Sequence, residues 1–373
     1  MIRNYNRLVF LLRNVSFFLI ILLCTLPLSL SCSKWKPVHG MYVMEGRIVS
    51  EEEITEAALS DFDFFYLVAP PRWEAEDFDQ DEQWILDKYV SGHQYARPQV
   101  VSRFVETAHK VGACVLCSFP GREFIHIATD SLRRERFARM AAAFADRYGY
   151  DGIELDWEHT VTPELHVAMM EALRRALSRR PEGKTWLTTA LNTEHNYPAD
   201  LAERLQSAAD WVNLMYYDMG GGDWGRVPGH NAPLDRIRQN YSENWSQFDP
   251  RRLHIGLASY GYGYQGIAPG DTVPPGKTLS DYFMQSYRPD RREGWHEVWD
   301  QTAECPYFFA PDGSAFMTAE NDRSVRAKLD WIREKGFGGI FWWEFHCDWV
   351  PPVEAGGKGT HLITDYATEY ISR

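Results

Sequence analysis

The sequence predicts a (β/α)8 barrel (TIM barrel) that forms one domain. Short apolar runs alternate with longer segments of helical periodicity from residue 38 to the end of the 373-residue chain, a pattern typical of repeated βα units around a parallel sheet. The apolar runs number eight, as a closed barrel of this kind requires. Two connections are too long for a simple return, so we expect extended loops after strands 2 and 7.

The eight candidate strands are rich in β-branched, aromatic and other apolar residues. They are 38–43, 62–68, 113–118, 152–156, 186–191, 211–216, 253–258 and 339–343. Helix starts lie between them. Ser50 precedes three glutamates and predicts a capping box, whereas Thr162 followed by Pro163 predicts an N-cap and a first helical position. Residues 131–148 and 165–177 then place apolar residues at helical spacing.

The N-terminal segment differs from the rest of the chain. Three arginines precede an apolar run, 15–28, which is followed by small residues and Cys32. The run is shorter than the roughly 20 residues of a spanning helix, so we interpret 1–31 as an export signal peptide and 32–373 as the folded domain. The residues around Cys32 resemble a bacterial lipoprotein box. The expected location is therefore the bacterial cell envelope, as a lipoprotein, or the outside of the cell after ordinary cleavage.

Charge and cysteine usage exclude several classes of function. The formal net charge is −13, and no basic run suggests a nucleic-acid partner. Cys114 and Cys117 form a C-x-x-C within an apolar run, which indicates a packed strand rather than a redox pair. The other cysteines are too scattered for a zinc site. We expect no metal and no cofactor, and membrane contact only through a lipid anchor at Cys32.

Acidic residues alternate with apolar ones at the fourth candidate strand, where residues 150–158 read Tyr-Asp-Gly-Ile-Glu-Leu-Asp-Trp-Glu. Period-two alternation places Glu154, Asp156 and Glu158 on one face, directed into the barrel and towards its mouth. Three inward carboxylates are costly to bury, and a structural role would need three compensating partners. Like charges held close together raise at least one pKa, which creates a proton donor usable near neutral pH.

This stretch resembles the D-G-x-D-x-D-x-E motif of glycoside hydrolase family 18, the chitinase family. Asp151, Gly152, Asp156 and Glu158 match the motif, whereas Glu154 stands where the family has Asp. Four further segments resemble family motifs in the right order, so that the resemblance extends from residue 38 to about 370. They are 118–121 (a variant of S-x-G-G), 215–218 (M-x-Y-D), 229–234 (G-H-N-A-P-L) and 338–344 (the strand-eight motif).

The resemblance implies a single catalytic domain that retains configuration through substrate-assisted catalysis next to an N-acetylglucosamine. Glu158 protonates the departing glycosidic oxygen while the acetamide carbonyl of the sugar attacks the anomeric carbon, which gives an oxazolinium intermediate. Asp156 holds the acetamide N–H, and Tyr217 donates a hydrogen bond to the acetamide oxygen. Glu158 afterwards deprotonates the incoming water.

The resemblance also assigns the walls of the sugar pocket. Trp342 and Trp343 are adjacent and so face opposite sides of their strand, and the motif selects Trp343 as the floor of the cleavage site. Met215 and Asp218 are implied as neighbours of the pocket, and Tyr42 as a wall on the first strand.

Several residues near the fourth strand receive a supporting role. Asp151 has the opposite parity from Glu154, which predicts a structural carboxylate bonded to the backbone near the strand start, with Gly152 also structural. The Asp that the family has in place of Glu154 shares a proton with Asp156, so we expect this chain to remain active with a changed pH profile. His159 is expected in a loop or supporting position, because the family mechanism needs no histidine.

The two long connections carry aromatic residues. The first, 69–96, is acidic, and the second, from 259 to about 321, is rich in Tyr, Pro and Gly. The residues concerned are Trp73, Phe78, Trp84, Trp295 and Trp299. Exposed rings beside a cleft stack on the apolar faces of sugars, but rings in loops also pack small cores of their own. The sequence leaves both interpretations open.

The sequence leaves the natural glycan open. The candidates are chitin or chitooligosaccharides, N-glycans cut by an endo-β-N-acetylglucosaminidase activity, and peptidoglycan. Trp157 and Tyr217 favour the chitinase-like branch. A lectin-like lipoprotein that only binds glycans is the alternative from another class. Such relatives lose the catalytic acid, whereas Glu158 is present here.

Overall fold

The computed structural model describes residues 35–92, 97–179, 185–220, 227–278, 281, 283–285, 293–357 and 359–372. The chain from Pro37 to Arg373 forms one compact unit. The expected signal peptide and Cys32 lie outside the described residues. Within the described ranges, no helix has both the length and the apolar character needed to cross a membrane.

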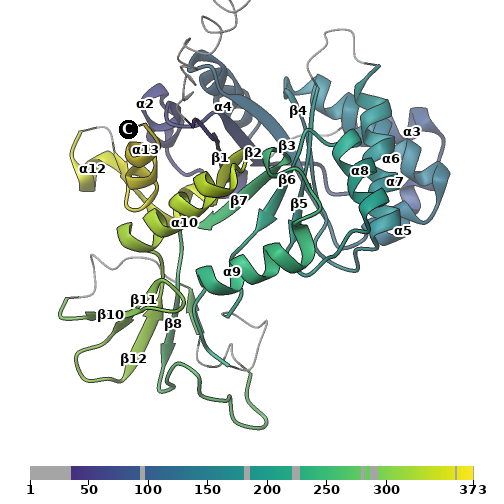
Figure 1. Ribbon diagram of the computed structural model, residues 1–373. Coiled ribbons are helices and arrows are strands. Elements are labelled where there is room, and N and C mark those ends of the chain that lie inside the picture. The colour runs from purple at the N-terminus through teal and green to yellow at the C-terminus, as the bar shows by residue number, and fades with distance from the viewer. Residues whose placement is uncertain are drawn as a thin grey trace, which may run out of the picture. The chain divides into compact units, whose positions relative to one another are not determined.

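Eight parallel strands close into a barrel in the order β1-β13-β7-β6-β5-β4-β3-β2 (Figure 1). The predicted (β/α)8 fold is confirmed, and each predicted strand end lies within two residues of the observed one. The first strand of the barrel pairs with its last, so the closure joins the two ends of the domain. The barrel strands are β1 (Val38–Met44), β2 (Phe64–Val68), β3 (Cys114–Pro120), β4 (Gly152–Asp156), β5 (Trp186–Asn192), β6 (Trp211–Met215), β7 (Leu253–Ala258) and β13 (Gly339–Trp343).

Helices surround the barrel (Figure 1). The longer ones are α4 (Pro98–Lys110), α6 (Ser131–Arg147), α7 (Pro163–Leu177), α8 (Ala199–Ala208), α9 (Leu234–Asn240), α10 (Asp322–Lys335) and α13 (Thr364–Ser372). The shorter ones are α2 (Glu56–Leu59), α3 (Glu82–Leu86), α5 (Phe124–Ala128), α11 (Phe345–Asp348) and α12 (Pro352–Ala355). Helix α7 begins at Pro163, as the sequence predicts.

The predicted capping box at Ser50 is wrong. Ser50 makes no capping hydrogen bond, and Glu51–Ile54 form only a short 3-10 turn. The carboxylate of Glu53 accepts the backbone N–H of Val49, one residue before Ser50, at 3.1 Å, and the same oxygen lies 3.1 Å from Nε2 of His346. The helix that follows, α2, is capped by the hydroxyl of Thr55. Glu53 thus accepts a backbone N–H one residue away from the expected one and also binds a partner almost 300 residues away in the chain, while the Ser50 half of the box is not formed.

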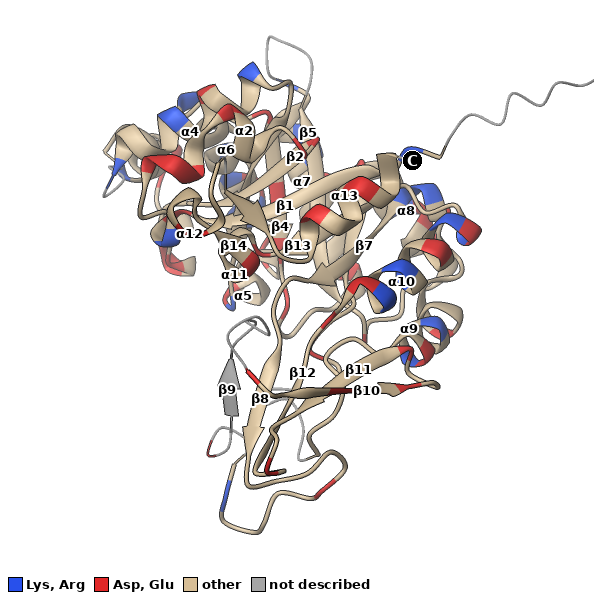
Figure 2. Ribbon diagram, turned by 90° about the vertical axis from the view of Figure 1, so that its left-hand side faces the viewer, with Lys and Arg blue, Asp and Glu red and all other residues tan. Residues whose placement is uncertain are grey.

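The connection after β7 differs from the expected loop, because it folds into a five-stranded antiparallel sheet in the order β10-β11-β12-β8-β9 (Figures 1 and 2). We call it the insertion sheet. Its strands are β8 (Tyr262–Gln265), β9 (Phe283–Gln285), β10 (His296–Asp300), β11 (Cys305–Phe309) and β12 (Ala315–Thr318). The connection after β2 holds α3 with the short turns Ala75–Asp79 and Asp87–Ser91. The sequence did not predict the insertion sheet, because short strands between turns rich in Gly and Pro show little periodicity in their apolar residues.

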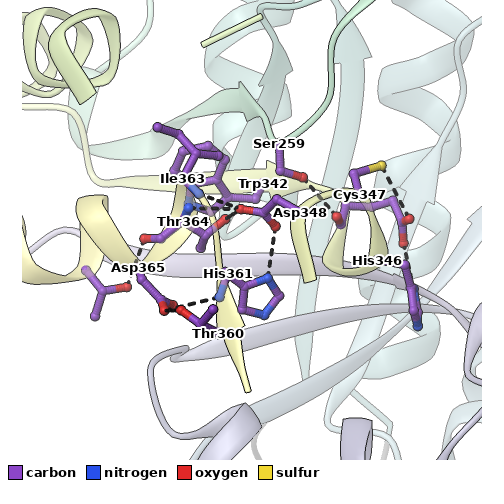
Figure 3. Close-up of polar contacts among 12 residues, drawn as sticks. Ser259, Trp342, His346, Cys347, Asp348, Thr360, His361, Ile363, Thr364 and Asp365 are labelled. Carbon is purple, nitrogen blue, oxygen red and sulfur yellow. Dashed lines mark hydrogen bonds and ion pairs between the residues drawn. The ribbon is translucent and has the colours of Figure 1, made fainter. Parts of the chain in front are cut away.

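The carboxylate of Asp348 attaches the C-terminal helix α13 to the end of β13 (Figure 3). Its Oδ2 accepts the backbone N–H groups of Ile363 and Thr364, both at 3.0 Å, and its Oδ1 lies 2.9 Å from Nδ1 of His361. His361 belongs to β15 (Thr360–His361), which pairs with β14 (Trp349–Val350). These bonds satisfy the first N–H groups of α13 and hold a negative charge at its N-terminus, where the helix dipole favours it.

Candidate active site at the mouth of the barrel

The start of β4 shows why the motif begins with Asp-Gly. An added Cβ on Gly152 would lie 2.1 Å from the backbone oxygen of Trp186, so no larger residue fits beside β5. The Oδ2 atom of Asp151 accepts the backbone N–H of Val115 at 2.7 Å and lies 2.8 Å from Nε2 of His109. Asp151 therefore ties β4 to β3 and lies at the opposite end of the strand from Glu158.

Glu154 lies inside the barrel in a network of hydroxyl and amide groups. The hydroxyl of Tyr42 donates to its Oε1, and Nδ2 of Asn213 donates to the same oxygen at 2.7 Å. Asn213 also accepts a hydrogen bond from the hydroxyl of Tyr66 at 3.3 Å. Burial raises the pKa of Glu154 to about 7, although the bonds from Tyr42 and Asn213 act in the opposite direction. This carboxyl therefore changes its charge near neutral pH.

Asp156 ends β4 one inward position beyond Glu154 and is 6% exposed. Burial raises its pKa well above the ordinary value, and the negative charges of Glu158 and Glu154 raise it further. Its Oδ1 has no hydrogen-bond partner among the described residues. A buried polar atom of this kind requires a partner, so Asp156 is free to bind a ligand.

Glu158 follows β4 and is partly exposed at the mouth of the barrel. Its backbone oxygen accepts a hydrogen bond from Nδ2 of Asn192 at 2.9 Å, which fixes the chain where it leaves the strand. Burial and the negative charge of Asp218 raise the pKa of Glu158, while the positive charges of His159 and Arg122 oppose the rise. A carboxylic acid that keeps its proton towards neutral pH and meets solvent can act as a general acid.

Tyr217 and Asp218 follow β6 in a turn that the structure holds firmly. Asp218 has a left-handed backbone with φ of 60°, and its N–H donates to Oδ1 of Asn231 at 2.7 Å. Its side-chain Oδ1 accepts hydrogen bonds from the hydroxyls of Tyr260, at 2.5 Å, and Tyr262. Burial raises the pKa of Asp218, against the effect of these two bonds. The insertion sheet, which contains Tyr262, thus helps to shape the turn.

The hydroxyl of Tyr217 faces the carboxylates of β4. Its pKa is raised far above the ordinary value by burial and by the negative charges of Asp218, Glu158 and Asp156. This hydroxyl has no hydrogen-bond partner in the described part of the chain. Tyr217 therefore presents a free donor next to the free acceptor of Asp156.

Trp343 and Trp342 point to opposite sides of β13, as the alternation predicts. Trp343 is partly exposed, and its ring centroid lies 5.4 Å from that of Tyr42 inside the barrel. Trp342 is fully buried on the other side, where its Nε1 donates to Nε2 of His39 at 3.0 Å. The hydroxyl of Ser259 donates to the backbone oxygen of Trp343 at 3.0 Å. Met215, the last residue of β6, is partly exposed at the same end of the barrel.

Four residues of the site were missed by sequence reasoning: Asn213, Asn231, Tyr260 and Tyr262. Asn213 did leave a signal, because it is a polar residue at an inward position of an otherwise apolar strand. Asn231 belongs to the G-H-N-A-P-L segment, but the sequence gives no sign that its amide binds the backbone of Asp218. The two tyrosines belong to the connection after β7, where the sequence predicts only an extended loop.

Two aromatic residues of the connection after β2, Trp73 and Phe78, pack against phenylalanines of α5 and α6. Phe78 is fully buried, and the ring centroid of Trp73 lies 4.9 Å from that of Phe124. Trp84 is 39% exposed, with the ammonium of Lys88 5.0 Å from its ring. Trp73 and Phe78 thus form a small core. Within the described ranges, no group of three or more His, Cys, Asp or Glu side chains could hold a metal ion.

Comparison with known proteins identifies the relatives of the chain. The family model of the glycosyl hydrolases family 18 matches residues 75–348. Chitinase A1 of Niallia circulans is 25% identical over 60% of this chain and 38% of its own length. An endochitinase of Brugia malayi is 26% identical over 72% of this chain and 58% of its own length. The cortical fragment-lytic enzyme of Bacillus anthracis is 28% identical over 58% of this chain and 51% of its own length. The chain thus spans about half the length of these relatives.

Solved structures show the same fold. A class V chitinase mutant from Nicotiana tobaccum in complex with NAG4 has a TM-score of 0.71 at 18% identity, and the match covers 91% of this chain and 99% of that one. A chitinase from Bacillus thuringiensis has a TM-score of 0.70 at 19% identity, with 91% of this chain and 70% of that chain covered.

Proposed function

The chain belongs to glycosyl hydrolase family 18, and on this premise we propose that it hydrolyses a β-glycosidic bond next to an N-acetylglucosamine, with Glu158 as its acid and base. One observation carries the proposal. Glu158, with a raised pKa, stands at the mouth of the barrel above two further carboxyls and beside a free tyrosine hydroxyl. This arrangement supplies both a proton donor and a polar pocket.

The chemistry that this site supports is substrate-assisted retention. Glu158 gives its proton to the departing oxygen while the acetamide carbonyl of the sugar attacks the anomeric carbon. The free Oδ1 of Asp156 accepts the acetamide N–H, and the free hydroxyl of Tyr217 donates to the acetamide oxygen. Both groups stabilise the charge that develops on the oxazolinium intermediate. Glu158 then removes a proton from the water that opens the intermediate.

Chitin or a chitooligosaccharide is the substrate class that the relatives favour, since two of those described above are named chitinases. A structure of similar fold is described as an N-acetylglucosaminidase, at 21% identity. Because one relative is named a cortical fragment-lytic enzyme, a cell-wall glycan is the second candidate substrate. Glu158 argues against a protein that only binds glycans, because binding does not require a proton donor.

The test compares the parent protein with Glu158→Gln on chromogenic chitobiose and chitotriose glycosides and on a high-mannose N-glycopeptide. Loss of the acid should lower kcat by about 10²–10⁴-fold on whichever substrate the parent cleaves. Glu203→Gln, an exposed change on α8, is the matched control and should keep parental rates. Parental activity in Glu158→Gln would contradict the assignment. Oligosaccharide binding by the parent without any cleavage would replace it with the lectin alternative.

A further inference from the structure

The segment that leaves β13 at the mouth of the barrel carries a histidine between two glutamates. His346 belongs to α11, and its Nδ1 lies 3.2 Å from Oε2 of Glu344, the residue that follows the strand. Its Nε2 lies 3.1 Å from Oε2 of Glu53, in the connection between β1 and β2. The side chains of His346, Glu344 and Glu53 are 13%, 0% and 6% exposed. The ring therefore joins the end of the last barrel strand to the connection after the first, largely away from solvent.

The two contacts together require a charged ring. A neutral imidazole has one nitrogen that donates and one that only accepts, whereas an ionised carboxylate has no hydrogen to donate. Both nitrogens of His346 can thus bind a carboxylate only when both carry a proton. The direction of the pKa agrees with this geometry. Burial lowers the pKa of His346, but the bonds to Glu344 and Glu53 outweigh burial and raise it above the ordinary value of 6.5.

The charges around the ring balance when it is protonated. Among the described residues, the charged groups of this cluster besides the ring are Glu53, Glu344 and Arg47, whose guanidinium lies 2.5 Å from Oε1 of Glu344. The thiol of Cys347 lies 3.5 Å from the same oxygen and stays neutral, because burial raises its pKa to about 12. Two cations then face two anions. If His346 loses its proton, a lone pair of the ring faces a carboxylate oxygen and one buried negative charge is left uncompensated, which is costly.

The cluster is attached to the tryptophan that is expected to form the floor of the sugar site. Glu344 follows Trp343 directly, and the hydroxyl of Ser259, after β7, lies 3.0 Å and 2.8 Å from the backbone oxygens of these two residues. Figure 3 shows Ser259, His346 and Cys347 around this segment. The backbone of Trp343 is therefore held from β7, while the side chain of its neighbour is held by His346. Because the two residues share a peptide bond, a shift of Glu344 moves the partly exposed ring of Trp343.

We propose that His346, as an imidazolium, is a positioning residue for sugar binding, because it fixes Glu344 against Glu53 and so holds the ring of Trp343 in the orientation that binds the substrate. At low pH both contacts are formed. As the pH rises and the ring loses its proton, one of the two contacts breaks and the affinity for the sugar falls. The inference rests on the proposed function, and it deepens that function by naming a residue that makes substrate binding depend on pH.

The first experiment needs no sugar. It follows the indole N–H signal of Trp343 by NMR in tryptophan-labelled protein, from about pH 5.5 to about pH 8.5, and identifies the signal by its loss in Trp343→Phe. The signal should move in the parent with a midpoint above the ordinary histidine value of 6.5. In His346→Gln this movement should be absent. In Glu53→Gln the midpoint should shift to lower pH, because the ring keeps only one carboxylate.

The matched control is His126→Gln. It removes an exposed histidine that is paired with a single glutamate, Glu123, at 3.4 Å. The Trp343 signal should titrate in this variant as it does in the parent.

The second experiment measures the affinity for chitotetraose by calorimetry in the Glu158→Gln background, in which the acid neither cleaves nor titrates. Below about pH 6, adding His346→Gln should weaken binding by about 3–10-fold, since a charge-assisted bond is lost. The two proteins should then converge as the pH rises. Glu154 and Asp156 titrate in both proteins, so the comparison isolates the histidine.

Two outcomes overturn the proposal. A Trp343 signal with the same pH dependence in the parent and in His346→Gln would show that the ring does not control this tryptophan. An affinity ratio that stays constant with pH would show that His346 supports the fold only. If the parent binds no chitotetraose while the Trp343 signal still follows His346, the positioning role stands and the proposed function is what fails.

Discussion

The buried carboxyl of Glu154 links the chemistry of the site to the stability of the domain. Its pKa of about 7 in the folded protein is above the ordinary value of 4.5, so the folded state holds this proton more tightly than the unfolded state. The stability that Glu154 contributes is fully present below pH 4.5 and is lost as the pH rises through about 7.

Glu154→Gln should remove this dependence while keeping an oxygen for the bonds from Tyr42 and Asn213. When the pH rises from 4.5 to 8, the free energy of unfolding should fall in both proteins, but by about 3 kcal/mol less in the variant. This difference follows from the rise in the pKa of Glu154 on folding, at about 1.4 kcal/mol per pKa unit. Urea unfolding at the two pH values measures this difference. Parallel changes in both proteins would show that folding does not raise the pKa of Glu154. Glu203→Gln should behave as the parent does.

At the scale of elements, the insertion sheet is fastened to α10 by a buried ion pair. The ammonium of Lys328, on α10, lies 2.9 Å from the carboxylate of Glu320, which follows β12, and 3.3 Å from the sulfur of Cys305, on β11. Both charged side chains are almost fully buried. Because Tyr262 of the same sheet holds Asp218, this pair also supports the turn that presents Tyr217.

Lys328→Met should destabilise the domain by about 3–5 kcal/mol, since it leaves Glu320 as a buried charge without its cation. Arg333→Met is the matched control on the same helix, because Arg333 and Asp330 form a pair that is about half exposed, and its loss should cost under about 1 kcal/mol. Denaturant unfolding of both variants measures the difference. Equal effects would mean that the buried pair does not fasten the sheet.

At the scale of the whole molecule, the barrel closes where its first and last strands meet. Gly339 begins β13 between Val38 of β1 and His254 of β7. An added Cβ would lie 2.7 Å from the backbone oxygen of Val38 and 2.8 Å from the ring of His254. The residue at the closure must therefore be glycine.

Gly339→Val should lower the melting temperature and the soluble yield, because overpacking costs about 1–3 kcal/mol and here also forces apart the pair of strands that closes the barrel. Gly46→Ala is the control, since nothing lies within 4 Å of an added Cβ at Gly46. Thermal unfolding compares the two. A melting temperature of Gly339→Val equal to that of the parent would show that β1 and β13 can separate without loss of the fold.

The local pattern of apolar and polar residues was sufficient to predict the barrel and part of the site. Apolar runs bounded by turns gave the eight barrel strands, because each run must be buried against its neighbours. Alternation gave the inward direction of Glu154 and Asp156 on β4 and the opposite directions of Trp342 and Trp343 on β13, because the side-chain period of a strand is two. These properties depend only on a residue and its near neighbours in the chain.

The pairings within the site were decided by tertiary structure. Asn213 meets Glu154 from a strand 59 residues later, and Tyr262 meets Asp218 from the insertion sheet 44 residues on. Such contacts depend on the closure and register of the whole barrel, and the pKa values depend on the burial that closure produces. The sequence by itself therefore determined which residues face inward. Only the folded chain decided which partners they find there, because it alone brings distant segments to hydrogen-bonding distance.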